Sequence, residues 1–178
     1  MPQWPVEITS RDNLTLVSYL TLPRHADPDR DGKADAHVPL VLLVHGGPWA
    51  RDSYGYGGYN QWLANRGYAV LSVNFRGSTG FGKEFTNAGN GEWAGKMHED
   101  LIDAVQWAVG QGVTTADKVA IMGGSYGGYA TLAGLTFTPD TFACGVDIVG
   151  PSNLNTLLGT VPPYWASFYK QLTRRMGD

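Results

Sequence analysis

The chain has little cysteine, no long apolar run and no excess of positive charge. Its single cysteine among 178 residues, Cys144, cannot form a disulfide within the chain, and its apolar surroundings predict a buried core position. No window reaches the roughly 18 consecutive apolar residues of a membrane span. The net charge of −3 lacks the basic excess that is usual in nucleic-acid-binding proteins. We therefore expect neither a membrane nor a nucleic acid as partner.

The N-terminus also lacks the charged segment followed by an apolar segment that marks a secretion signal. A cytoplasmic location is expected on that basis. With 43% hydrophobic residues the chain can build a core, and its length fits one domain on the usual prior of roughly 100–200 residues per domain. The 24 glycines are close to twice the average share of about 7%, and they cluster after apolar runs, where tight turns are expected.

Apolar runs alternate with helix-like segments along the chain. Two period-2 segments separated by a turn, residues 6–9 and 14–22, predict an antiparallel hairpin. Four further runs are typical of strands buried on both faces: residues 40–44, 69–75, 118–122 and 145–149. Helical spacing marks the segments 59–66, 97–109, 126–137 and 165–176. This order predicts an α/β fold with a mostly parallel sheet, helices on both of its faces and the hairpin at its N-terminal edge.

The motif with the clearest chemistry is Gly123-Gly124-Ser125-Tyr126-Gly127, which lies between an expected strand and an expected helix. A Gly-x-Ser-x-Gly sequence in this context forms a sharp turn that projects the serine hydroxyl above the sheet. The glycines are required because a Cβ at either position would collide with neighbouring backbone. We therefore predict that Ser125 is a nucleophile. A glycine-rich turn with an incidental serine is the alternative.

A second turn, His45-Gly46-Gly47-Pro48, follows the third expected strand. Turns of this kind commonly supply one backbone donor of an oxyanion hole, and the residue after the nucleophile supplies the other. We therefore expect the N–H groups of Gly47 and Tyr126 to hold the developing negative charge. His45 is interpreted as a residue that orients the loop by hydrogen bonds, and not as the general base.

Several long segments carry a family resemblance: VLLVHGGPWARD (41–52), NRGYAVLSVNFRGSTGFGKEF (65–85), GEWAGKMHEDLIDAVQW (91–107) and GGSYGGYATL around Ser125. They resemble the prolyl oligopeptidase family of serine peptidases, in its acylaminoacyl-peptidase and dipeptidyl-peptidase-like branch. The resemblance implies that residues 1–178 are part of an α/β-hydrolase domain, which in this family stands beside a β-propeller. It also implies cleavage of short or N-acylated peptides through a serine, with no metal or organic cofactor.

The resemblance assigns further residues. Tyr164 and Trp165 fall where relatives line the primary specificity pocket, with ordinary packing as the alternative. Arg76 is expected to brace the loop beside the site, and Ser78 to be a turn residue. Three acidic residues are expected to cap a helix or to lie on its surface: Glu92, Asp100 and Asp103.

The sequence departs from the family in its catalytic triad, which runs in the order Ser, Asp, His. All four histidines precede Ser125: His25, His37, His45 and His98. The acids that follow it, Asp140, Asp147 and Asp178, do not resemble the family's acid. Since a serine hydroxyl needs an adjacent base, three interpretations stay open. The chain is truncated at its C-terminus, a complementing C-terminal segment completes the site, or the protein has another role.

The same residues leave three functions open. The first is a serine peptidase whose base and acid lie outside this sequence. The second is a carboxylesterase on the same fold, since an acyl-enzyme serves esters equally well. The third is a catalytically incomplete fragment with no activity of its own. Because loss of strands would leave an unpaired sheet edge, we also expect self-association or a need for a partner.

Overall fold

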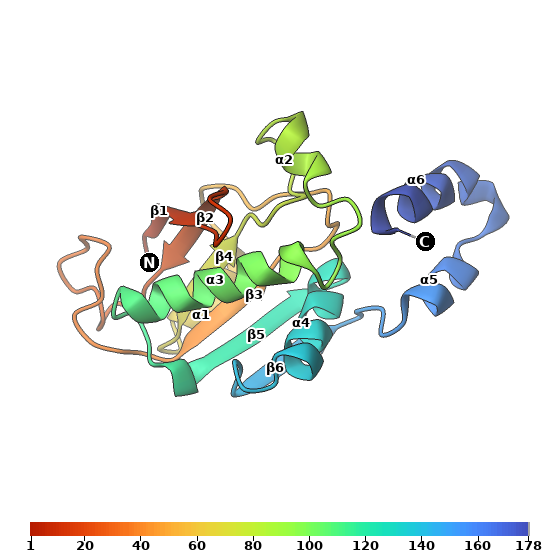
Figure 1. Ribbon diagram of the computed structural model, residues 1–178. Coiled ribbons are helices and arrows are strands. Elements are labelled where there is room, and N and C mark those ends of the chain that lie inside the picture. Colours follow the sequence, from red (N-terminus) through yellow and green to blue (C-terminus); the bar gives the residue numbers. More distant parts are fainter. Residues whose placement is uncertain (178) are drawn as a thin grey trace.

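A computed structural model describes residues 1–177, which form a six-stranded sheet in the order β1-β2-β4-β3-β5-β6 (Figure 1). The strands are β1 Gln3–Thr9, β2 Thr15–Thr21, β3 Leu40–Val44, β4 Ala69–Val73, β5 Val119–Gly124 and β6 Cys144–Ile148. β1 and β2 form an antiparallel hairpin, and β2 pairs antiparallel with β4. The other neighbouring pairs, β3 with β4, β3 with β5 and β5 with β6, are parallel. The predicted α/β fold with an antiparallel N-terminal hairpin is confirmed.

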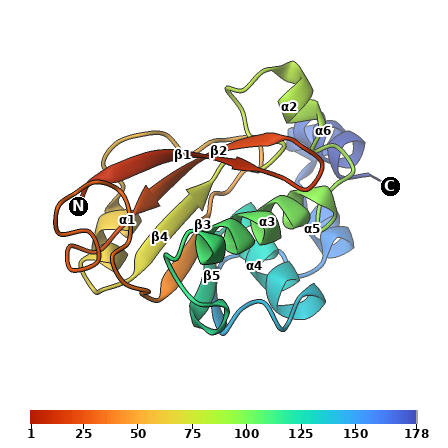
Figure 2. The ribbon, with the colours of Figure 1, turned by 60° about the vertical axis from the view of Figure 1, so that its left-hand side comes forward.

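Helices cover the sheet on both faces and extend beyond its end. Their bounds are α1 Gly58–Ala64, α2 Lys83–Asn87, α3 Lys96–Gly110, α4 Tyr126–Phe137, α5 Leu154–Thr160 and α6 Ala166–Met176. Helix α1 packs on β4 and β2, whereas α4 packs on β5, β6 and β3. Figures 1 and 2 show α5 and α6 beyond the carboxyl end of β5, away from the body of the sheet.

The core is divided by the alternation of side chains along the central strands. In β3, Leu40, Leu42 and Val44 point into the larger cluster, which α3 and α4 complete. Val41 points to the opposite face, where it packs with Val70, Met122 and Leu63 of α1. Because β3 and β4 are covered on both faces, they read as continuous apolar runs.

The sequence analysis was wrong about Cys144 and about the burial of β6. Cys144 is exposed, and Val146 is 49% exposed. β6 lies at the edge of the sheet formed by the described residues, and α4 covers only the face toward which Gly145 points. Cys144 and Val146 therefore point to the opposite face of the sheet. Helix α1 lies on that face but packs on β4 and β2, so it leaves these two side chains exposed. An apolar run alone does not distinguish an edge strand from a central one.

Helices α2 and α5 were not expected from the sequence. Both are short, with 5 and 7 residues. Helix α2 has a single apolar residue, and the three leucines of α5, Leu154, Leu157 and Leu158, have helical spacing but span too short a segment to predict a helix. Across residues 1–177 no helix combines the length and the apolar character needed to cross a lipid bilayer.

Candidate active site

Ser125 occupies the turn between β5 and α4 with φ 56° and ψ −117°. This region of backbone space is sparsely populated by residues other than glycine, and such conformations cluster at functional sites. The Ser125 N–H donates to the Ile148 carbonyl at 2.9 Å, and its carbonyl accepts from the Tyr129 N–H at 3.0 Å. The residue is exposed. Two neighbouring elements thus hold its backbone while its side chain stays accessible.

The glycines around Ser125 are required for close packing, as the sequence predicted. A Cβ on Gly123 would lie 2.5 Å from the carbonyl carbon and oxygen of Gly127. A Cβ on Gly127 would overlap the Val44 carbonyl oxygen of β3, and one on Gly128 would lie 2.6 Å from the Gly150 Cα. Contacts this short are prohibitive for any side chain. These glycines therefore let the turn fit between β3 and the segment that follows β6.

A cavity of about 540 Å³ opens beside Ser125, between the serine turn and helices α5 and α6. Its lining comprises Gly47, Trp93, Ser125, Tyr126, Val149, Gly150, Pro151, Ser152, Asn153, Thr156, Leu157, Thr160, Val161, Pro162, Trp165, Phe168 and Leu172. The lining is mainly apolar, and it contains the expected nucleophile and both expected oxyanion donors. The cavity has the size and character of a small-molecule or peptide side-chain site.

The structure separates the two expected pocket residues. Trp165 lines the cavity and is 53% exposed, whereas Tyr164 is 81% exposed and does not line it. The two rings meet edge to face, with centroids 6.0 Å apart. Phe168, one turn further along α6, lines the cavity instead. Its position on the same face of α6 as Leu172, four residues on, is the signal that the sequence offered for it.

The two expected oxyanion donors have free N–H groups. Tyr126 is the first residue of α4, so its N–H has no partner within the helix. Gly47 lies in the loop after β3, and within residues 1–177 neither N–H donates to another element. The positive end of the α4 dipole adds to the attraction for an anion at this point. The Tyr126 side chain is buried against Phe75 and Trp93 and takes no part in the cavity's polar chemistry.

His45 orients the loop, as expected, and its ring forms hydrogen bonds with Gly46 and Ser78, not with Ser125. Its Nδ1 is 2.8 Å from the Gly46 carbonyl oxygen, and its Nε2 is 2.9 Å from the Ser78 Oγ. The ring stacks on Phe75 with centroids 4.5 Å apart. Burial lowers the pKa of His45, so the ring is neutral near pH 7. Both ring nitrogens are therefore engaged away from the nucleophile.

In the part of the chain that the structure describes, no histidine forms a hydrogen bond with Ser125. His98 lies in α3 and bonds the Thr138 hydroxyl through Nε2 at 3.0 Å. Asp147 accepts the Gly150 N–H at 2.8 Å, and Asp140 follows the far end of α4. Asp178 lies outside the described residues. Within residues 1–177, no side chain forms a hydrogen bond with the Ser125 hydroxyl.

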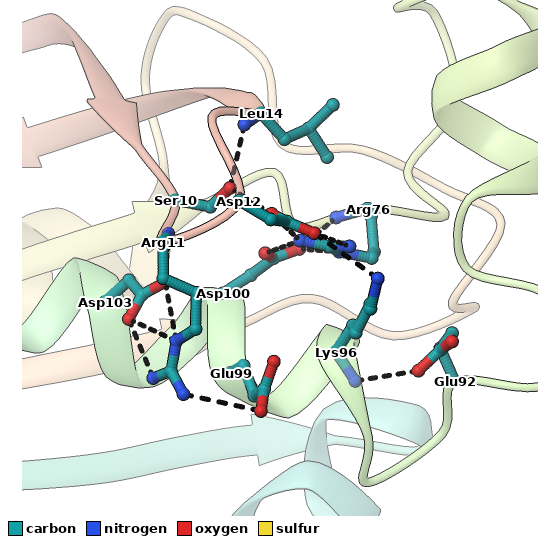
Figure 3. A network of polar contacts seen from close by, with 10 residues as sticks. All are labelled: Ser10, Arg11, Asp12, Leu14, Arg76, Glu92, Lys96, Glu99, Asp100 and Asp103. Carbon is teal, nitrogen blue, oxygen red and sulfur yellow. Dashed lines mark hydrogen bonds and ion pairs between the residues drawn. The ribbon is translucent and has the colours of Figure 1, made fainter.

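Arg76 braces the loop after β4 through a buried ion pair (Figure 3). Its guanidinium bonds Asp100 at 2.6 and 2.8 Å and Asp12 at 2.7 and 2.8 Å. The backbone N–H of Arg76 also donates to the Asp100 carboxylate, at 2.9 Å. The hairpin turn, the β4 loop and α3 are thus joined at one point beside the site.

The expectation that Asp100 and Asp103 lie on the helix surface or cap it was wrong. Asp100 is 0% exposed and Asp103 is 9% exposed. Asp103 accepts three side-chain or backbone hydrogen bonds from Arg11 between 2.7 and 3.0 Å, beside a longer one at 3.2 Å. Each carboxylate faces inward because it meets an arginine that is distant in sequence: Arg11 of the hairpin turn pairs with Asp103, and Arg76 of the loop after β4 pairs with Asp100. Glu92 does cap, accepting the Lys96 N–H at 3.0 Å at the start of α3.

One cluster of three carboxylates resembles a cation site in composition. Asp27, Asp29 and Asp31 place oxygens within 4.8 Å of one another. They lie in the loop between β2 and β3, at the opposite end of the sheet from Ser125. Asp27 is the buried member, and its oxygens already accept from the Trp4 indole at 3.1 Å and the Asp31 N–H at 2.9 Å. The cluster takes no part in the candidate site.

Known proteins resemble this chain closely in both sequence and structure. It is 89% identical over all 178 residues to dipeptidyl aminopeptidase BIII of Pseudoxanthomonas mexicana, of which it covers 26%. It is 55% identical, over 96% of its length, to dipeptidyl peptidase family member 6 of Caenorhabditis elegans, of which it covers 25%. A solved structure of a Mycobacterium tuberculosis puromycin-hydrolyzing peptidase superposes with a TM-score of 0.86 at 28% identity. That match covers 99% of this chain and 26% of the other.

The chain spans about a quarter of the length of these relatives. Residues 55–173 match the prolyl oligopeptidase family, and this segment includes the serine turn and most of the cavity lining. The resemblance seen in the sequence motifs is confirmed: the chain belongs to the prolyl oligopeptidase family.

Proposed function

We propose that the protein is a serine peptidase that cleaves short peptides through an acyl-enzyme on Ser125. One observation carries the proposal. An exposed serine with φ 56° stands at the wall of a mainly apolar cavity, next to two backbone N–H groups that have no partner within residues 1–177. Accessible nucleophile, oxyanion donors and a side-chain pocket are the three parts that acyl transfer needs in one place.

In the proposed reaction the Ser125 Oγ attacks the scissile carbonyl carbon while a base removes its proton. The N–H groups of Gly47 and Tyr126 hold the oxyanion that forms, and each such donor is worth about 2.7–4 kcal/mol in the transition state. The carbon–nitrogen bond then breaks, and the amine leaves with the proton. Water hydrolyses the acyl-enzyme in a second round of the same chemistry. The base and its acid partner come from residues outside this sequence.

Removal of dipeptides from a free amino terminus is the finer activity that the comparisons favour. The relative that is 89% identical carries the name dipeptidyl aminopeptidase, whereas plant acylamino-acid-releasing enzymes are 29–33% identical. The apolar lining contributed by Leu157, Trp165 and Phe168 suits an apolar side chain next to the scissile bond. Release of N-acylated residues and hydrolysis of carboxylic esters are the competing activities.

A fluorophosphonate and intact mass spectrometry test the nucleophile. Both the 178-residue chain and the complete product of its gene are treated. We expect one adduct on the complete product, none on Ser125→Ala, and an unchanged adduct on Ser53→Ala, which alters an exposed serine outside the cavity. The 178-residue chain should react far more slowly, because within residues 1–177 no base is hydrogen-bonded to the Ser125 hydroxyl. Labelling that persists in Ser125→Ala would contradict the proposal.

Three chromogenic substrates then separate the activities. They are a dipeptidyl anilide with a free amino terminus, an N-acetylated aminoacyl anilide and a small carboxylic ester. Preferential cleavage of the dipeptidyl anilide supports a dipeptidyl peptidase. Preferential cleavage of the N-acetylated aminoacyl anilide supports an acylaminoacyl peptidase. Cleavage of the ester alone would replace the peptidase with an esterase on the same fold.

A further inference from the structure

We propose that Arg175 is a positioning residue for the cavity beside Ser125, because its side chain fixes helix α6 on Trp49 in the loop between β3 and α1. Helix α6 in turn holds Trp165 and Phe168 against the substrate side chain. The inference rests on the proposed function, since it takes this cavity to receive the side chain next to the scissile bond. It assigns a role to an arginine that does not itself line the cavity.

Helix α6 is attached to the rest of the described residues through its C-terminal half. Residues 166–171 are all exposed, whereas Leu172 and Met176 are buried and Arg175 is partly buried. Figures 1 and 2 show the same arrangement, with α6 standing away from the sheet and following α5 along the chain. A contact made by the C-terminal half therefore decides where the other half of the helix lies.

The aromatic residues that α6 brings to the cavity lie at its other end. Trp165, which directly precedes the helix, and Phe168 in its first turn both line the cavity. At a rise of about 1.5 Å per residue they lie about 15 Å and about 10 Å along the axis from Arg175. A tilt of about 10° at Arg175 would thus move Trp165 by roughly 2–3 Å. Since a gap of about 1 Å already removes up to half of a van der Waals contact, such a tilt would empty one wall of the cavity.

Arg175 makes two contacts with loops in the body of the protein. Its guanidinium carbon lies over the Trp49 ring, 5.3 Å from the ring centroid. Its backbone carbonyl accepts the Gly91 N–H, from the loop between α2 and α3, at 2.7 Å. This carbonyl belongs to the last turn of α6, where carbonyls have no partner within the helix. Side chain and backbone thus hold one residue of α6 to two separate loops.

The contact between the guanidinium and the indole ring is partly shielded from water. The Nη1 atom of Arg175 is buried, and within residues 1–177 no acceptor forms a hydrogen bond with it. A cation over the face of an indole ring is attracted by the ring's quadrupole, and the attraction grows where water is excluded. The Trp49 ring therefore supplies the attraction that keeps this end of α6 in place.

Trp49 is a firm point of attachment because the turn that carries it is held by hydrogen bonds. The Ala50 N–H donates to the Pro48 carbonyl at 2.8 Å, and the Ala50 carbonyl accepts the Thr79 N–H at 2.9 Å. The Trp49 ring also packs on Trp93, with centroids 6.4 Å apart, and Trp93 lines the cavity. The arginine thus joins α6 to a wall of the cavity that the loops after β3 and β4 hold in place.

The test compares Arg175→Met with wild type in the form of the protein that reacts with the fluorophosphonate. Two dipeptidyl anilides are used, identical except for phenylalanine or alanine next to the scissile bond. We expect Arg175→Met to raise KM for the phenylalanyl substrate by about 10-fold with kcat within about twofold, because α6 no longer packs on the bound side chain. KM for the alanyl substrate should rise by less than about threefold, since a methyl group gains little from that wall.

A double-variant cycle tests whether Arg175 acts through Trp49. Trp49→Leu removes the ring and should raise the ratio of the two KM values as Arg175→Met does. Combining the two changes should add less than about twofold to that ratio, because each single change already breaks the same contact. Thermal melts identify variants that do not fold. If Arg175→Met is one of them, the ratio of KM values in Trp49→Leu decides.

The matched control is Arg66→Met. Arg66, which follows α1, also lies over a tryptophan ring, with its guanidinium carbon 4.6 Å from the Trp62 centroid, and neither residue lines the cavity. This variant loses the same kind of contact at another place. Both KM values should therefore stay within about twofold of wild type.

An unchanged KM for the phenylalanyl substrate in a folded Arg175→Met, or an equal rise for both substrates, would overturn the inference. The same selective rise in Arg66→Met would also overturn it, and so would effects of Arg175→Met and Trp49→Leu that multiply in the double variant. Failure of the proposed function is distinguishable from these outcomes. In that case wild type cleaves neither anilide, and the phenylalanyl and alanyl nitrophenyl esters replace the anilides in the same comparison.

Discussion

Asp52, in the loop between β3 and α1, is a carboxylate placed where its charge is unfavourable. Its Oδ2 is buried, and within residues 1–177 no group donates a hydrogen bond to it. Its backbone is held by Asn74, which accepts the Asp52 N–H at 2.8 Å and donates to its carbonyl at 3.2 Å. Because burial disfavours the charged form, it raises the pKa of Asp52 to about 6.

This shift predicts a pH-dependent stability with a definite sign. The pKa of Asp52 is higher in the folded protein than in the unfolded chain. At pH values between these two pKa values the folded protein therefore binds more protons than the unfolded chain. The free energy of unfolding consequently falls as the pH rises through this range. Asp52→Asn removes this dependence. We expect its stability relative to wild type to increase by about 1–2 kcal/mol between about pH 4 and about pH 8. Urea unfolding at both pH values measures this difference. Asp29→Asn, at an exposed carboxylate, is the control, and equal pH profiles for wild type and Asp52→Asn would contradict the prediction.

At the scale of elements, the ion pairs in Figure 3 fasten the β1–β2 hairpin to α3 and to the loop that carries Ser78. They differ in burial. The Arg76 side chain is 4% exposed and that of Asp100 is 0% exposed, whereas Lys96, 3.6 Å from Asp12, is 51% exposed. A buried pair is costly to break because the remaining charge is stranded, but an exposed pair is worth little.

We therefore expect Arg76→Met to lower the free energy of unfolding by about 3–5 kcal/mol, and Lys96→Ala by about 0–1 kcal/mol. The double variant Arg76→Met with Asp100→Leu should recover part of the loss, since it leaves no buried charge. Chemical denaturation of the three variants gives these values. If Arg76→Met proves no more harmful than Lys96→Ala, the buried pair does not anchor the hairpin.

Most elements were predictable from the sequence because each central strand is covered on both faces. Leu40–Val44 and Ala69–Val73 read as apolar runs for that reason, and the Gly-x-Ser-x-Gly motif located the turn at Ser125. Asp100 was not predictable as a buried residue, since its partner Arg76 comes from the loop after β4, 24 positions earlier in the sequence. Burial set by contacts distant in sequence leaves no local pattern.

The lining of the cavity was not predictable for the same reason. Trp165 was identified by resemblance, but Leu157 and Phe168 join it only because α5 and α6 fold over the end of β5. Helix α5 is a 7-residue helix with an Asn153 cap, whose side chain accepts the Thr156 N–H at 3.0 Å. A cap of this kind is a usable sequence signal, and Leu154, Leu157 and Leu158 follow it at helical spacing, but over seven residues this pattern predicts a turn as well as a helix.

At the scale of the whole molecule, the edge of the sheet at β6 carries exposed apolar side chains. β6 has a single neighbour, β5, so its other edge is unpaired within residues 1–177. Val146 on β6 is 49% exposed, and Val149 just after it is 85% exposed. Unpaired strand edges with apolar side chains template association with other chains.

We therefore predict that the 178-residue chain self-associates through β6. Sedimentation velocity at increasing concentration should show a growing fraction of dimers and larger species. Val146→Lys should suppress it, because a lysine on an exposed edge strand must be desolvated when two edges pair. Gln111→Lys, at an exposed position at the end of α3, adds the same charge away from the edge and should not suppress self-association. A monomer at all concentrations would mean that the edge is protected in solution. Equal suppression by both variants would mean that net charge, and not the strand edge, controls association.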